Sequence, residues 1–73
     1  MEKDIYKIVG SNIKKYREKK GYSCEEFSKM IGLDKEYLEE IEKKGVDGSI
    51  TFDVLDGVCN CLDISMKELI EDK

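Results

Sequence analysis

The chain has 73 residues, of which 40% are apolar and 41% are charged, and its formal net charge is −4. A chain this short has material for one hydrophobic core, so residues 1–73 are predicted to form a single domain, and no apolar run approaches the ~18 residues of a membrane helix. Because Met1 to Tyr6 lacks a signal-peptide pattern and the three cysteines are not the even set of a disulfide framework, the sequence favours a cytoplasmic protein without membrane association.

The charges are unevenly distributed along the chain. Residues 1–22 carry seven basic and three acidic side chains, residues 23–45 carry four and seven, and residues 46–73 carry two and seven. The acidic total argues mildly against a nucleic-acid ligand, since phosphates attract Lys and Arg, but the N-terminal part is basic.

Two amphipathic helices are predicted in the first half of the chain. The first ends at Gly21, and its inward stripe has spacings of three and four: Ile5, Ile8, Val9, Ile13 and Tyr16. Ser23 and Glu26 form a capping box that opens the second helix, which ends at Gly32. The inward residues of this short helix are Phe27, Met30 and Ile31.

The third helix is predicted at about residues 34–44, capped by Asp34 and stopped by Gly45, with Tyr37, Leu38 and Ile41 facing inward. Residues 45–50 are predicted to form a loop because they are rich in glycine and small polar residues.

Two further helices follow the loop. Thr51 is expected to cap the fourth, whose predicted inward residues are Phe52, Leu55, Val58, Cys59 and Leu62. Gly57 inside this helix indicates either close helix packing or a tolerated loss of about 1 kcal/mol. After Asp63 in the turn, Ser65 and Glu68 form a second capping box and open the last helix, which contains Met66, Leu69 and Ile70. No strand pattern is present, so the predicted fold class is all-α with five helices.

Several spaced motifs carry a family resemblance. They are Gly10-x-x-Ile13-x-x-x-Arg17-x-x-x-Gly21, Ser23-x-Glu25-Glu26-Phe27-Ser28, Ile31-Gly32-Leu33 and Leu38-x-x-Ile41-Glu42, followed by Leu55, Val58, Cys59, Leu62, Ile64, Ser65 and Leu69. Together they resemble the lambda-repressor-like, Cro/XRE-type helix-turn-helix DNA-binding family over about residues 8–70. The resemblance implies that the second and third helices form the helix-turn-helix and that the third is laid in the DNA major groove.

A sequence-specific transcriptional regulator that binds double-stranded DNA is therefore the leading hypothesis. Winding the third helix at about 100° per residue places its outward arc opposite Leu38 and Ile41. The residues expected to face bases are Lys35, Glu36, Glu39 and Glu40, and those expected near phosphates are Ser23, Cys24, Lys43 and Lys44. Cys24 departs from the family, since many members carry a DNA-contacting glutamine there.

The family pattern also implies a structural ion pair between Arg17 and Glu42. Arg17 is the only arginine in the chain, and a guanidinium binds a carboxylate through two hydrogen bonds. A phosphate contact by Arg17 is the alternative.

The outward arc of the third helix has two less specific interpretations. It could be a solvated face with i,i+4 ion pairs between Lys35 and Glu39, Glu39 and Lys43, and Glu40 and Lys44. Alternatively, its three carboxylates could dock a basic protein surface, as in an antitoxin-like or partner-binding module. The lysines of the first helix, Lys14, Lys15, Lys19 and Lys20, similarly suit either a solvated face or phosphate contacts.

Neither an enzyme nor a metal or cofactor site is predicted. The chain has no histidine and no glycine-rich phosphate loop, and residues 59 and 61 on a helix point about 200° apart, so Cys59 and Cys61 are interpreted as packing residues. Cys24, in the first turn of a helix, is expected to have its thiolate favoured by the helix dipole.

A weak homodimer is expected from family habit, because two-fold operators are read by paired domains. Phe52, Met66 and Ile70 could supply its apolar patch.

Overall fold

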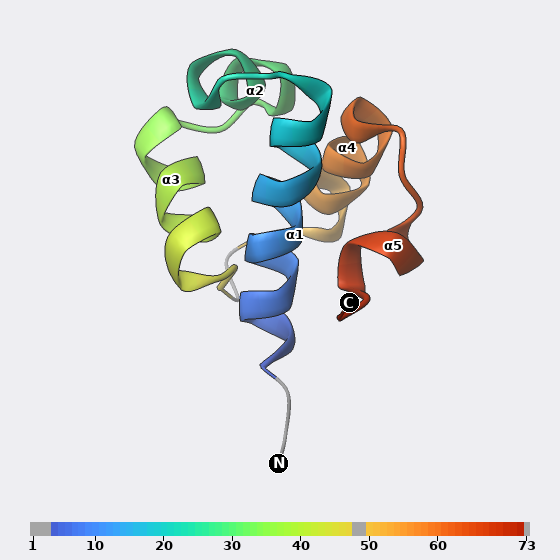
Figure 1. Ribbon diagram of the computed structural model, residues 1–73. Helices are drawn as coiled ribbons and strands as arrows, with labels where there is room; N and C mark the ends of the chain where they lie inside the picture. The colour runs from blue at the N-terminus through green and yellow to red at the C-terminus, as the bar shows by residue number, and fades with distance from the viewer. Residues whose placement is uncertain (1–3, 48–49, 73) are drawn as a thin grey trace.

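The computed structural model describes residues 4–47 and 50–72, and this part of the chain is all-α, with five helices and no strand. The helices are α1 (Ile5–Lys20), α2 (Cys24–Ile31), α3 (Lys35–Lys44), α4 (Phe52–Leu62) and α5 (Met66–Ile70). Helix α1 runs through the middle of the molecule, α2 crosses one of its ends, and α3 lies on the opposite side of α1 from α4 and α5 (Figure 1). Gly48 and Ser49 of the predicted loop lie outside the described residues.

Local capping sets the helix boundaries. Ser23 and Ser65 each complete a capping box, with Glu26 and Glu68 respectively, and the Thr51 hydroxyl accepts a hydrogen bond from the amide of Val54. These predictions are confirmed. Asp34 occupies the predicted N-cap position of α3, but its side chain makes no capping hydrogen bond.

One hydrophobic core joins the helices. Its most deeply buried side chains come from all five helices: Phe27, Ile13, Leu38, Ile41, Leu62, Leu69 and Val58. In the described ranges, no helix combines the length and the apolar character needed to cross a bilayer.

Three residues predicted to face inward are instead exposed, and these predictions were wrong. Ile5, Met30 and Phe52 expose 47%, 45% and 69% of their surface. Ile5 and Phe52 are the first residues of α1 and α4, and Met30 lies in the last turn of α2. The apolar stripe therefore predicts correctly which side of each helix faces the core, but it includes residues near the helix ends that the core does not cover.

The two interpretations of Gly57 can be separated. A β-carbon built on Gly57 would have no neighbouring atom within 4 Å, so no other helix approaches it closely. Gly10 of α1 is different, because a β-carbon there would overlap the carbonyl oxygen of Ile41 and lie 2.9 Å from the α-carbon of Gly45. Because Gly10 has no side chain, the backbones of α1 and of the end of α3 contact each other directly.

Candidate nucleic-acid interface

The candidate interface is built on the two helices α2 and α3 and the tight turn between them. Gly32 adopts the left-handed conformation, with φ of 73°, and the amide of Leu33 donates to the carbonyl of Ser28 at 2.9 Å. Phe27 on α2 and Leu38 on α3 are fully buried in the same apolar core, and the two helices are in contact. The turn and this contact hold α3 with its opposite face in solvent.

An ion pair fixes the inner edge of α3 to α1. Nε of Arg17 donates to Oε2 of Glu42 at 2.7 Å, and Nη2 donates to Oε1 at 3.0 Å. Both side chains are largely withdrawn from solvent, with 9% and 6% of their surface exposed. The remaining guanidinium nitrogen, Nη1, donates to the carbonyl of Tyr22 at 2.7 Å. Arg17 therefore connects α1, α3 and the chain segment that leads into α2.

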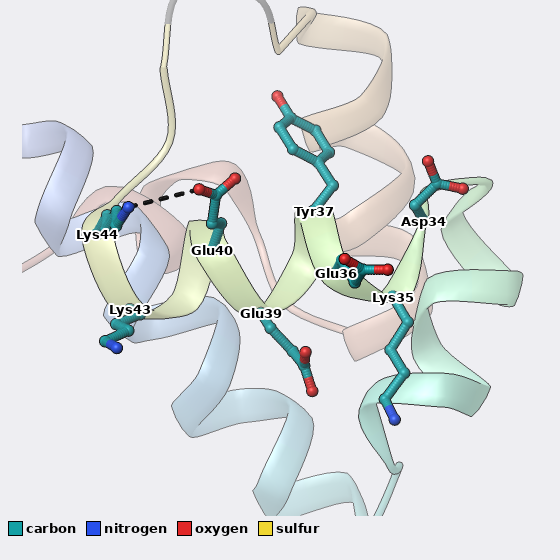
Figure 2. A pocket seen from close by; sticks show the side chains of 8 residues that line it. All are labelled: Asp34, Lys35, Glu36, Tyr37, Glu39, Glu40, Lys43 and Lys44. Carbon is teal, nitrogen blue, oxygen red and sulfur yellow. Dashed lines mark hydrogen bonds and ion pairs between the residues drawn. The ribbon is translucent and has the colours of Figure 1, made fainter.

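The outward arc of α3 is an open, shallow hollow lined by charged side chains (Figure 2). All the residues predicted to face bases lie on it and are exposed: Lys35, Glu36, Glu39 and Glu40. Lys43 and Lys44, predicted to contact phosphates, lie on the same arc and are also exposed. Lys35, Glu39 and Lys43 point to one side of α3, whereas Tyr37 and Glu40 point to the other (Figure 2).

Of the three i,i+4 pairs expected for a solvated face, one forms. Nζ of Lys44 lies 3.5 Å from Oε1 of Glu40. Within residues 4–47 and 50–72, Lys35, Glu39 and Lys43 form no ion pair with one another. The arc thus presents unpaired groups of both signs.

The start of α2 lies beside this arc. A second hollow between α1, α2 and α3 is lined by six residues: Lys14, Arg17, Cys24, Glu39, Glu42 and Lys43. It brings Cys24 and Lys43, both predicted to lie near phosphates, to one place and adds Lys14 from the basic face of α1. Ser23 precedes them as the exposed N-cap of α2.

The expected reactivity of Cys24 is corrected by its surroundings. Its thiol lies 3.7 Å from Oε1 of Glu42, to which it donates a hydrogen bond. Burial, followed by the negative charge of Glu42, raises the pKa of Cys24 above that of a free thiol, although Arg17 opposes this. The thiol form is therefore favoured, in contrast to the prediction made from the helix dipole.

Asn12 is an important residue that the sequence interpretation missed. It is buried, and its Nδ2 donates to the carbonyls of Leu69 at 2.7 Å and Glu71 at 2.8 Å. The side chain therefore fastens the end of α5 to α1. The sequence does contain an indication of this role, because Asn12 is a polar residue beside the apolar stripe formed by Val9, Ile13 and Tyr16.

No metal site is evident in the described part of the chain, since no group of three or more His, Cys, Asp or Glu side chains is suitably placed. All three cysteines are free. Cys59 is buried and Cys61 is half-buried, and both pack against the core, in agreement with their interpretation as packing residues.

Comparison with known proteins connects this geometry to DNA. A family model described as a Cro/C1-type HTH DNA-binding domain matches residues 12–73. The HTH-type transcriptional regulator SinR of Bacillus subtilis (strain 168) is 39% identical over 67 residues, which are 90% of this chain and 59% of SinR. The chain therefore spans about three fifths of the length of this curated relative.

Solved structures of similar sequence share the fold. The N-terminal DNA-binding domain of SinR from Bacillus subtilis matches with a TM-score of 0.76 and 35% identity, covering 90% of this chain and 94% of that domain. A crystal structure of SinR in complex with DNA matches with a TM-score of 0.75 and 35% identity, covering 86% and 98%.

Proposed function

The chain belongs to the Cro/C1-type helix-turn-helix DNA-binding family, and we propose that it is a sequence-specific transcriptional regulator that inserts α3 into the major groove of double-stranded DNA. The observation that carries the proposal is the exposed outward arc of α3, held by the Arg17–Glu42 pair on a fold shared with a DNA-binding domain. In this role the protein is a cytoplasmic binding protein that needs neither catalysis nor a cofactor.

Different parts of the surface have different roles in this proposal. Lys35, Glu36, Glu39 and Glu40 face base edges, because the N-terminal part of a recognition helix enters the groove. Ser23, Cys24, Lys43 and Lys44 lie near the sugar-phosphate backbone, where the amides at the start of α2 and the ammonium groups meet phosphate oxygens. Arg17 and Glu42 stay bound to each other and position α3.

The salt dependence of binding tests this assignment. Fluorescence anisotropy with a labelled duplex should show affinity falling steeply as salt rises, and Lys43→Gln should lower the slope of log K against log salt by about one. Lys67→Gln is the matched control, since Lys67 is exposed on α5, on the other side of α1. Equal effects of the two substitutions, or no binding at low salt, would contradict the proposal.

A protein-interaction module is the second candidate, because three carboxylates on the outward arc of α3 suit a basic protein surface. The similarity to a DNA-bound structure favours DNA. A weak homodimer stays a prediction: Phe52 and Ile70 are exposed as it requires, whereas Met66 is half-buried against the core.

A further inference from the structure

We propose that Glu36 and Glu39 are specificity-determining residues that read cytosine, each accepting a hydrogen bond from the amino group of a cytosine in the major groove. The preferred duplex would then carry cytosine at two neighbouring positions of each bound site. This inference rests on the proposed function and names the sequence class that the same helix selects.

Ion pairing separates the carboxylates of α3 into two groups. Glu42 is buried against Arg17, and Glu40 lies 3.5 Å from the ammonium group of Lys44. Glu36 and Glu39 are exposed, and within residues 4–47 and 50–72 neither forms an ion pair or a side-chain hydrogen bond. These two carboxylates are therefore free to bind a ligand.

The chemistry of the major groove then selects the base. An ionised carboxylate only accepts hydrogen bonds, and the donors on base edges in this groove are the amino groups of cytosine and adenine. Beside the adenine amino group lies N7, an acceptor that repels the second carboxylate oxygen. Beside the cytosine amino group lies a C–H group with no lone pair, so cytosine is the favoured partner.

The positions of the two residues suit base contacts. Glu36 is in the first turn of α3 and Glu39 follows at i+3, so their β-carbons are neighbours about 5–6 Å apart on the helix surface. This spacing matches one or two base-pair steps of about 3.4 Å. Lys35 and Lys43 lie four residues on either side of Glu39, and their ammonium groups offset the repulsion between carboxylates and phosphates.

The first arm of the test uses the unmodified protein. Duplexes are selected from a random pool with the 73-residue chain, and the affinity for the selected duplex is measured by anisotropy. Replacing a cytosine by N4-methylcytosine keeps its pairing with guanine but places a methyl group where the carboxylate would accept. We expect roughly tenfold weaker binding at each of two neighbouring cytosines and no change at a cytosine in the flanks.

The second arm uses E36Q and E39Q, with D56N as the charge-matched control, since Asp56 is exposed on α4, across α1 from α3. Glutamine pairs with the N6 and N7 atoms of adenine, so each of the two variants should change one preferred cytosine to adenine in a repeated selection. Each should also bind a scrambled duplex more tightly, because a negative charge is lost, while binding the original selected duplex less tightly. D56N should keep the original base preference.

The outcomes distinguish the inference from the function on which it rests. If the protein binds a preferred duplex but N4-methylation and both variants leave the affinity and preference unchanged, the cytosine assignment is wrong and DNA binding stands. If the folded chain binds no duplex even at low salt, both the assignment and the proposed function are wrong.

Discussion

Arg17 is the residue on which the position of α3 depends most. Its three hydrogen bonds join α1 to Glu42 and to the carbonyl of Tyr22, and the pair is shielded from solvent. Arg17→Met would leave the Glu42 carboxylate buried without its cation, which typically costs roughly 3 to 5 kcal/mol. Urea denaturation should show this loss.

Glu40→Gln is the control for Arg17→Met. It removes a carboxylate from the exposed Glu40–Lys44 pair of the same helix and should leave the free energy of unfolding nearly unchanged. Similar losses for the two variants would contradict a structural role for the buried pair.

Cys24 should behave as an unreactive thiol. Burial and Glu42 raise its pKa in the folded protein, so the thiol form stabilises the fold below the unfolded pKa. That contribution is lost as pH rises through the folded pKa. We expect the stability difference between the wild type and Cys24→Ser to shrink as the pH rises above the ordinary pKa of a thiol. We also expect iodoacetamide to alkylate Cys24 more slowly than a free cysteine peptide. Alkylation faster than that of the peptide would contradict this account.

At the scale of elements, two helical glycines should respond to alanine in opposite directions. Gly57→Ala places a methyl group in open space and should stabilise α4 by roughly 0.5 to 1 kcal/mol. Gly10→Ala places it against the carbonyl of Ile41, forcing α1 and α3 apart, and overpacking of this kind costs about 1 to 3 kcal/mol. Thermal unfolding of both variants checks the pair, and stabilisation by Gly10→Ala would show that the helices do not meet there.

Capping made the helix boundaries predictable from the sequence. Ser23 with Glu26, Ser65 with Glu68, and Thr51 act within one helical turn, so they can be identified without knowing the tertiary structure. The outward arc of α3 was also predictable, because helical periodicity fixes it relative to Leu38 and Ile41.

Long-range contacts limited what could be predicted. The bonds of Asn12 span 57 and 59 residues of sequence, so its role as a clamp for α5 depends on how the helices pack. Phe52 was predicted to lie in the core because it is apolar and falls on the inward stripe of α4, but the core does not extend to this first residue of the helix. The thiol chemistry of Cys24 likewise depends on Glu42, eighteen residues away.

The charge layout of the whole molecule gives the domain an orientation on DNA. Lys14 of α1 shares a hollow with Lys43 of α3, whereas residues 46–73 carry seven acidic and two basic side chains. The helices of that acidic segment lie across α1 from α3 (Figure 1). Phosphates should therefore be attracted to the hollow lined by Lys14 and Lys43 and repelled by the α4 and α5 side, which favours one docking face despite the net charge of −4.

Mapping backbone amide shifts by NMR while duplex DNA is added at low salt tests the DNA-binding face most directly. The account predicts shifts at residues 23–25 at the start of α2 and at residues 35–44 in α3, with α4 and α5 essentially unchanged. Shifts confined to α4 and α5, or a spectrum that does not respond to DNA, would contradict it.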